Sequence, residues 1–105
     1  MFTWMAVDPV DGSVNVVFHD RRGLAGTMTG LTLARSIDGG RTFVNHRLPV
    51  EPFDCCARSS FLGDYNGLDA WGGRVVAVFP VLPATGDQRI MAATMRFQPG
   101  TQTLQ

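Results

Sequence analysis

The chain has 105 residues, enough for one small domain, and 45% of them are apolar, so it can bury a core. Nine basic and nine acidic residues give a formal net charge of zero with no basic block, which argues against nucleic acid as a partner. No apolar run is long enough to span a membrane. All basic residues are arginine. This reflects either genome composition or a use of guanidinium groups in binding carboxylates.

Alternation of apolar and polar residues predicts short strands along the whole chain. In SVNVVFHD, Val14, Val16 and Phe18 fall on one face. The run RVVAVFPVL is almost wholly apolar, as in a strand that is covered on both faces. Glycines and prolines punctuate these segments often. Strands are expected at Trp4–Asp8, Val14–His19, Thr32–Ser36, Phe43–Leu48, Tyr65–Ala70, Arg74–Val81 and Ile90–Arg96, with a short last one at Thr101–Leu104.

An internal repeat divides the chain. Ala6–Phe18 aligns without a gap on Gly67–Phe79, at an offset of 61 residues. We therefore expect an all-β chain of two antiparallel meanders, residues 1–50 and 63–105, joined by a linker at 51–62. Repeated meanders of this kind are typical of β-propeller blades. Because a propeller needs about four to eight blades, we expect this chain to be the C-terminal portion of a longer one.

The stretch SIDGGRTF predicts a tight hairpin turn in the first meander. Gly39 and Gly40 supply the positive φ angles that such a turn requires. Asp38 can accept hydrogen bonds from backbone N–H groups across the turn, and the hydroxyls of Ser36 and Thr42 can add further bonds. Each residue type therefore has a folding role.

The spacing Ser36-x-Asp38-x-Gly40-x-Thr42-Phe43 resembles the Asp box of the bacterial neuraminidase repeats. This motif marks the sialidase-like β-propeller superfamily. The resemblance implies that the box is a structural element on the outer turn of a blade, away from the active centre, with Phe43 covering the turn. The fold alone does not assign an activity.

The segments WMAVDPVDGSVNVVFHDRR and FLGDYNGLDAWGGRVVAVF resemble the closing blades of secreted bacterial sialidase-like proteins. The resemblance implies part of an exo-sialidase-type glycosidase, with carbohydrate, such as a sialylated glycan, and the N-terminal blades as partners. The full-length protein would be secreted or periplasmic, although this chain shows no signal peptide, and the chain alone is expected to be inactive. The alternative is a non-catalytic propeller that binds glycans or serves as a scaffold.

Sialidases use a tyrosine nucleophile and hold the substrate carboxylate with three arginines. The resemblance therefore points to Tyr65 and Asp64 as catalytic candidates, and to Arg21, Arg22 and Asp20 as substrate-binding candidates. Both groups lie where strands meet loops, and such loops often carry function. The structural alternative is that Tyr65 packs in the core and the arginines pair with Asp20 or Asp64.

The remaining candidates favour structural or surface roles. The only glutamate, Glu51, lies in a Pro-Val-Glu-Pro loop typical of a surface. Cys55 and Cys56 are adjacent, with Cα atoms ~3.8 Å apart, shorter than the usual disulfide span. The alternatives are two free thiols, a strained disulfide between these two neighbours, or disulfides with cysteines in the missing part of the protein. His46 is expected in solvent, and His19 in a structural hydrogen bond or facing the channel. No spacing supports a metal site, and no cofactor is expected.

Overall fold

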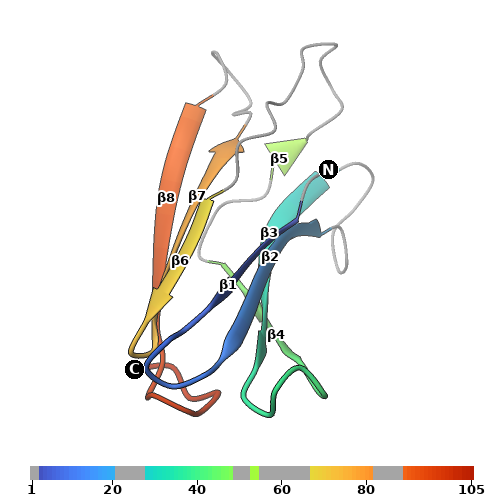
Figure 1. Ribbon diagram of the computed structural model, residues 1–105. Coiled ribbons are helices and arrows are strands. Elements are labelled where there is room, and N and C mark those ends of the chain that lie inside the picture. Colours follow the sequence, from blue (N-terminus) through green and yellow to red (C-terminus); the bar gives the residue numbers. More distant parts are fainter. Residues whose placement is uncertain (1–2, 21–27, 49–52, 55–66, 82–88) are drawn as a thin grey trace.

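The computed structural model describes residues 3–20, 28–48, 53–54, 67–81 and 89–105, and these form two antiparallel β-sheets (Figure 1). The strands are β1 (Trp4–Val7), β2 (Val14–Asp20), β3 (Met28–Ser36), β4 (Val44–Arg47), β5 (Phe53–Asp54), β6 (Gly67–Trp71), β7 (Arg74–Val81) and β8 (Arg89–Arg96). Within these residues the expectation of an all-β chain is confirmed. None of the described segments forms a helix that could cross a membrane.

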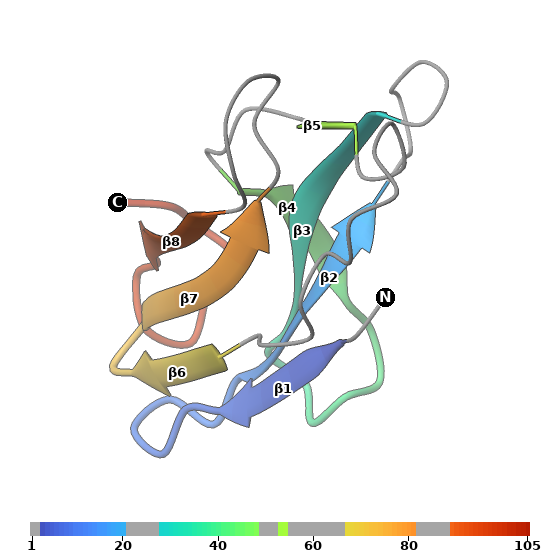
Figure 2. The same ribbon diagram turned by 90° about the horizontal axis from the view of Figure 1, so that it is seen from above.

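Each sheet is a meander of neighbouring strands. The first has the order β1-β2-β3-β4, and β5 also pairs with β3; the second has the order β6-β7-β8 (Figure 2). The long β3 pairs with β2 along one edge. Along its other edge, β4 pairs with Thr32–Arg35 and β5 with Met28–Thr29. The two predicted meanders are thus present as two separate sheets.

Three features differ from the predicted strands. β3 begins at Met28 instead of Thr32, β5 falls within the predicted linker, and the strand expected at Thr101–Leu104 is reduced to one bridge between Phe97 and Leu104. The first two differences belong together, because Met28 and Thr29 of β3 pair with Asp54 and Phe53 of β5. The local pattern of apolar residues does not show a pairing between segments so far apart in the chain.

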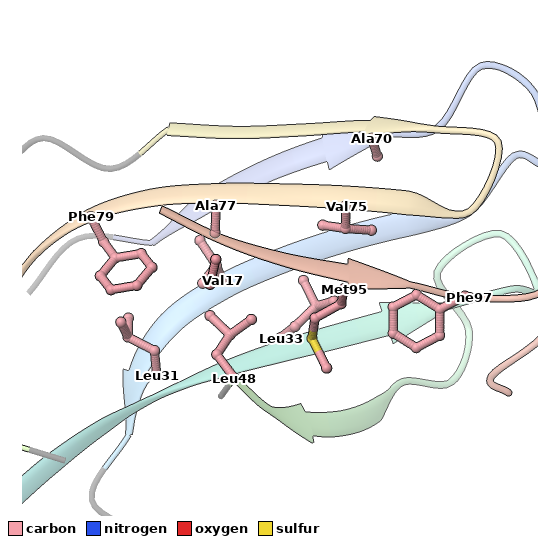
Figure 3. Packing of buried hydrophobic residues seen from close by; sticks show 11 residues of the cluster. Val17, Leu31, Leu33, Leu48, Ala70, Val75, Ala77, Phe79, Met95 and Phe97 are labelled. Atoms are coloured by element: carbon pink, nitrogen blue, oxygen red, sulfur yellow. The ribbon is translucent and has the colours of Figure 1, made fainter. Parts of the chain in front are cut away.

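The core lies between the two sheets. Directly paired residues on antiparallel strands share a face, and the pair Val17 and Leu33 is buried on the face that looks toward the second sheet. β1 and β6 are the strands that approach most closely across the gap. The cluster comprises Val17, Leu31, Leu33, Leu48, Ala70, Val75, Ala77, Phe79, Ala93, Met95 and Phe97 (Figure 3). Burying each of the larger side chains contributes about 1.5–3 kcal/mol.

The register refines the internal repeat. Val14 corresponds to Val75, 61 residues later, as the gapless alignment has it. Val7, the partner of Val14, corresponds to Ala70, the partner of Val75, which is 63 residues later. The alignment therefore holds for β2 and β7 but slips by two residues in β1 and β6, because the turn of the second sheet is shorter.

Candidate functional site

The structure does not test the predicted ligand site. Of its residues only Asp20, at the end of β2, lies within the described segments, and only its backbone is described. Asp20 and Gly67, the first residue of β6, both lie at the end of the sheets opposite the Asp-box hairpin. The predicted residues outside the described segments are Arg21, Arg22, Glu51, Cys55, Cys56, Asp64 and Tyr65.

The Asp-box hairpin has the hydrogen bonds that its sequence predicts. Asp38 Oδ1 accepts from the N–H groups of Arg41 and Thr42, at 3.0 and 2.9 Å. Its Oδ2 accepts from the Thr42 hydroxyl. The Ser36 hydroxyl donates to Asp38 Oδ1 at 2.8 Å and accepts from Gly40 N–H at 2.9 Å. The predicted role of Asp38 within the turn is confirmed.

Solvent surrounds this hairpin. Gly39 and Gly40 have φ angles of 77° and 91°, the left-handed conformation that favours glycine. Phe43, the last residue of the motif, is 44% exposed. The Thr42 hydroxyl and then its N–H stabilise the ionised carboxyl and lower the pKa of Asp38 to about 2. The hairpin is therefore ordered by its own polar groups.

Asp8 joins the two sheets from a fully buried position in the turn between β1 and β2. Its Oδ1 accepts from Val10 N–H at 2.8 Å and from Gly72 N–H at 2.9 Å. Its Oδ2 accepts from Gly73 N–H at 2.7 Å. A carboxylate that accepts several N–H groups satisfies donors that burial would otherwise leave unpaired. One side chain thus orders both turns at this end of the molecule.

Arg35 is a second buried polar centre beside Asp8. Its Nη2 donates to Asp11 Oδ2 at 2.8 Å, and its Nη1 donates to the Ser13 hydroxyl at 2.9 Å. Nη1 also donates to Asn15 Oδ1 at 3.1 Å, and Nε donates to the Thr101 carbonyl at 3.0 Å. The guanidinium fork suits such a converging set of acceptors. Arg35 therefore has a structural role, and its guanidinium binds a carboxylate, that of Asp11.

The C-terminal segment packs against this centre. The Arg35 guanidinium lies 4.3 Å from the centre of the Phe97 ring, a cation–π contact. Gln102 Nε2 donates to the Arg35 carbonyl at 2.6 Å, and Gln102 Oε1 lies 2.7 Å from His46 Nε2. The His46 ring also meets the Phe97 ring edge-on at 4.8 Å. The expectation that His46 is a solvated side chain is therefore wrong.

Asp11, in the turn between β1 and β2, and His19, on β2, have shifted pKa values. Burial raises the pKa of Asp11, but N–H groups of Gly100 and Ser13 and the Arg35 guanidinium outweigh this effect. The net pKa of Asp11 lies well below its usual range. His19 pairs with Leu31 on the face toward the core. Burial lowers its pKa, which favours the neutral imidazole.

The sequence held a signal for Arg35 that its motifs did not reveal. In LTLARS the residues at 31, 33 and 35 share one face, and Leu31 and Leu33 are apolar. A charged residue at the next inward position predicts a buried partner. Asp8 gave no such signal, because its partners Gly72 and Gly73 are 64 and 65 residues away.

The second sheet has a shallow, positively charged depression near the turn between β6 and β7. It is lined by Gly72, Arg74, Arg96, Phe97 and Gln105. Arg74 and Arg96 are exposed cross-strand partners, so their positive charges lie side by side. Within the described segments, no group of three or more His, Cys, Asp or Glu side chains is placed to hold a metal ion.

Comparison of the chain with protein-family models, with curated proteins and with solved structures finds no match.

Proposed function

We propose that this chain is a two-sheet section of a sialidase-like β-propeller that binds sialylated glycans and, in the full-length protein, hydrolyses them. The observation that carries the proposal is the Asp-box hairpin. Its serine, aspartate, glycine and threonine occupy the motif spacing and form a closed set of hydrogen bonds. Two meanders that pack face to face, closest at their first strands, are the arrangement that neighbouring blades require.

The ligand site belongs at the end of the sheets away from the Asp box. Asp20 and Gly67 both lie there, and the candidates adjoin them in sequence. In the proposal, Arg21 and Arg22 bind the carboxylate of the glycan, since a guanidinium pairs with a carboxylate through two parallel hydrogen bonds. Asp64 orients an arginine, and the Tyr65 hydroxyl faces the sugar as the nucleophile.

Binding tests the ligand site directly. The chain would be titrated with sialyllactose and followed by calorimetry, using Arg21→Ala and Arg22→Ala. Loss of one charge-assisted contact should weaken binding about 10- to 100-fold. Arg41→Ala is the matched control, because Arg41 is exposed on the Asp-box hairpin and its loss removes the same charge. Equal weakening by all three variants, or no binding by the unchanged chain, would overturn the assignment.

Turnover separates a glycosidase from a non-catalytic glycan-binding propeller. The full-length protein and its Tyr65→Phe variant would be assayed with a fluorogenic sialoside. A catalytic protein releases the fluorophore and loses this activity in the variant. Binding without release, unchanged by Tyr65→Phe, would identify the non-catalytic alternative.

A further inference from the structure

The two sheets contact each other through faces that are not equivalent in the internal repeat. In β7, Val75 and Phe79 are buried against the first sheet. Their repeat counterparts in β2 are Val14 and Phe18, which lie on the outer side of the first sheet, away from the second. The face that the second sheet buries is thus the counterpart of the face that the first sheet leaves outside.

The inner face of the first sheet likewise corresponds to the outer face of the second sheet. Val17 and Leu31 are buried on the inner face of the first sheet, at 1% and 0% exposure. By strand register their counterparts are Val78 and Ile90, on the outer face of the second sheet. These are 40% and 61% exposed. The outer face of the second sheet therefore carries counterparts of the residues that the first sheet buries, and there they are exposed to solvent.

The molecule consequently carries both halves of its own sheet-to-sheet interface on its two outer sides. We define the leading face as Met5, Val7, Val14 and Val16 of the first sheet. We define the trailing face as Val76, Val78, Ile90 and Ala92 of the second sheet. Met5 and Val7 are 61% and 55% exposed, so the leading face is apolar and accessible as well.

The sequence of β7 supports an occupant on the trailing face. Its run RVVAVFPVL predicts a strand that is covered on both faces. Among the described segments, the first sheet covers one face of β7, and Val78 on the other face is 40% exposed. An apolar residue on a strand's outer face contributes to stability only when another surface removes it from water.

We propose that a second copy of this chain docks its leading face on the trailing face of the first. The contact would repeat the interface that already exists between the two sheets of one chain, which is why the occupant is a copy. Such a head-to-tail contact uses different surfaces on the two partners, and it continues until the ring closes or a filament forms. The inference concerns this chain by itself and does not depend on glycan binding; in a longer propeller, neighbouring blades would take the place of the second copy on these two faces.

Two charge-adding double variants test the interface. Met5→Lys with Val7→Lys disables the leading face, and Val78→Lys with Ile90→Lys disables the trailing face. The control is Val10→Lys with Ile37→Lys, at residues that are 55% and 46% exposed in turns outside both faces. Sedimentation velocity over a concentration series would measure the mass of the assemblies that each variant forms.

The expected pattern is specific to a head-to-tail contact. The unchanged chain and the control should associate as concentration rises, and each face variant alone should stay monomeric. A mixture of the two face variants should form a 1:1 dimer and nothing larger, because one intact leading face then meets one intact trailing face.

Three results would overturn the proposal. The first is an unchanged chain that stays monomeric at every concentration. The second is a mixture of the face variants that does not form the dimer. The third is association abolished by only one variant, which would indicate a two-fold contact of one face with itself. A variant whose circular dichroism shows lost β-structure would be replaced by threonine at the same two positions, because threonine suits strands and is less apolar.

Discussion

Gly73 N–H donates a hydrogen bond of 2.7 Å to Asp8 Oδ2, and this bond ties the turn of the second sheet to the turn of the first. Asp8 is fully buried, and Gly72 N–H donates to its other oxygen at 2.9 Å. One buried carboxylate therefore connects the two turns at this end of the sheets. Its contribution can be measured by changing either partner.

Asp8→Ala should lower the free energy of unfolding by about 3 kcal/mol, because buried N–H groups of both turns lose a charged acceptor. Asp8→Asn keeps one acceptor oxygen and should cost less. Urea denaturation followed by fluorescence measures both. Asp69→Ala is the control, since Asp69 is exposed on β6. Equal effects of Asp8→Ala and Asp69→Ala would show that the buried carboxylate has no special role.

Gly73→Ala should destabilise the chain more than Gly12→Ala. Both glycines have positive φ, 88° and 74°, so alanine introduces backbone strain at each. Only at Gly73 would the added Cβ also collide with the carbonyl oxygen of Phe97; the space around Gly12 is open. Gly12→Ala should cost about 1 kcal/mol and Gly73→Ala clearly more. The same urea titrations decide between them, and an equal cost would contradict the close approach to Phe97.

Arg35→Met should cost about 3–5 kcal/mol, because it leaves Asp11 without its buried cationic partner. Arg35→Lys keeps the charge but not the fork, and should fall between Arg35→Met and the unchanged chain. The double variant Arg35→Met with Asp11→Asn should cost less than the sum of the single changes. Strict additivity in this cycle would mean that the two side chains do not interact energetically.

Stability should fall as the pH drops below about 4, the usual pKa of an aspartate in the unfolded chain. The folded-state pKa of Asp11 lies well below that value. A depressed pKa contributes stability that is fully present above the unfolded pKa and is lost as pH falls toward the folded one. Asp11→Asn should therefore flatten the pH dependence between pH 4 and 2. Thermal melts measure this effect. A melting temperature that falls just as steeply with pH in Asp11→Asn as in the unchanged chain would contradict the depressed pKa of Asp11.

Asp38→Ala should change stability much less than Asp8→Ala. Asp38 also accepts two N–H groups, but that part of the hairpin is exposed and water can replace the carboxylate. The change should instead loosen the turn locally. Amide hydrogen exchange at Arg41 and Thr42 should become faster while the global unfolding free energy stays nearly constant. A loss as large as that of Asp8→Ala would mean that the Asp box supports the whole sheet.

Local sequence patterns predicted the elements of the fold well. Alternation placed β2, and an apolar run placed β7, at or close to their observed bounds, because both patterns are local properties of a strand. The residue types of SIDGGRTF predicted the hairpin and the role of Asp38, since all partners lie within a few residues. The apolar run in β7 predicted a strand that is covered on both faces, and this differs from the structure, because Val78 on the outer face is 40% exposed.

Long-range features could not be read in the same way. The partners of Arg35 include Thr101, 66 residues later, and β5 exists only because it meets the start of β3. The ring contact of His46 with Phe97 has the same origin. Each depends on chain segments that meet only after folding, and no local pattern encodes which segments these are.

By itself the sequence determined the strands, the glycine-dependent turns and the apolar character of both faces of β7, because steric and solvation preferences act residue by residue. The tertiary structure alone decided which face is covered. Val78 and its repeat counterpart Val17 are both apolar, yet one is 40% exposed and the other is 1% exposed. The difference arises because a strand's alternation defines two faces, whereas burial depends on which neighbouring sheet lies against each.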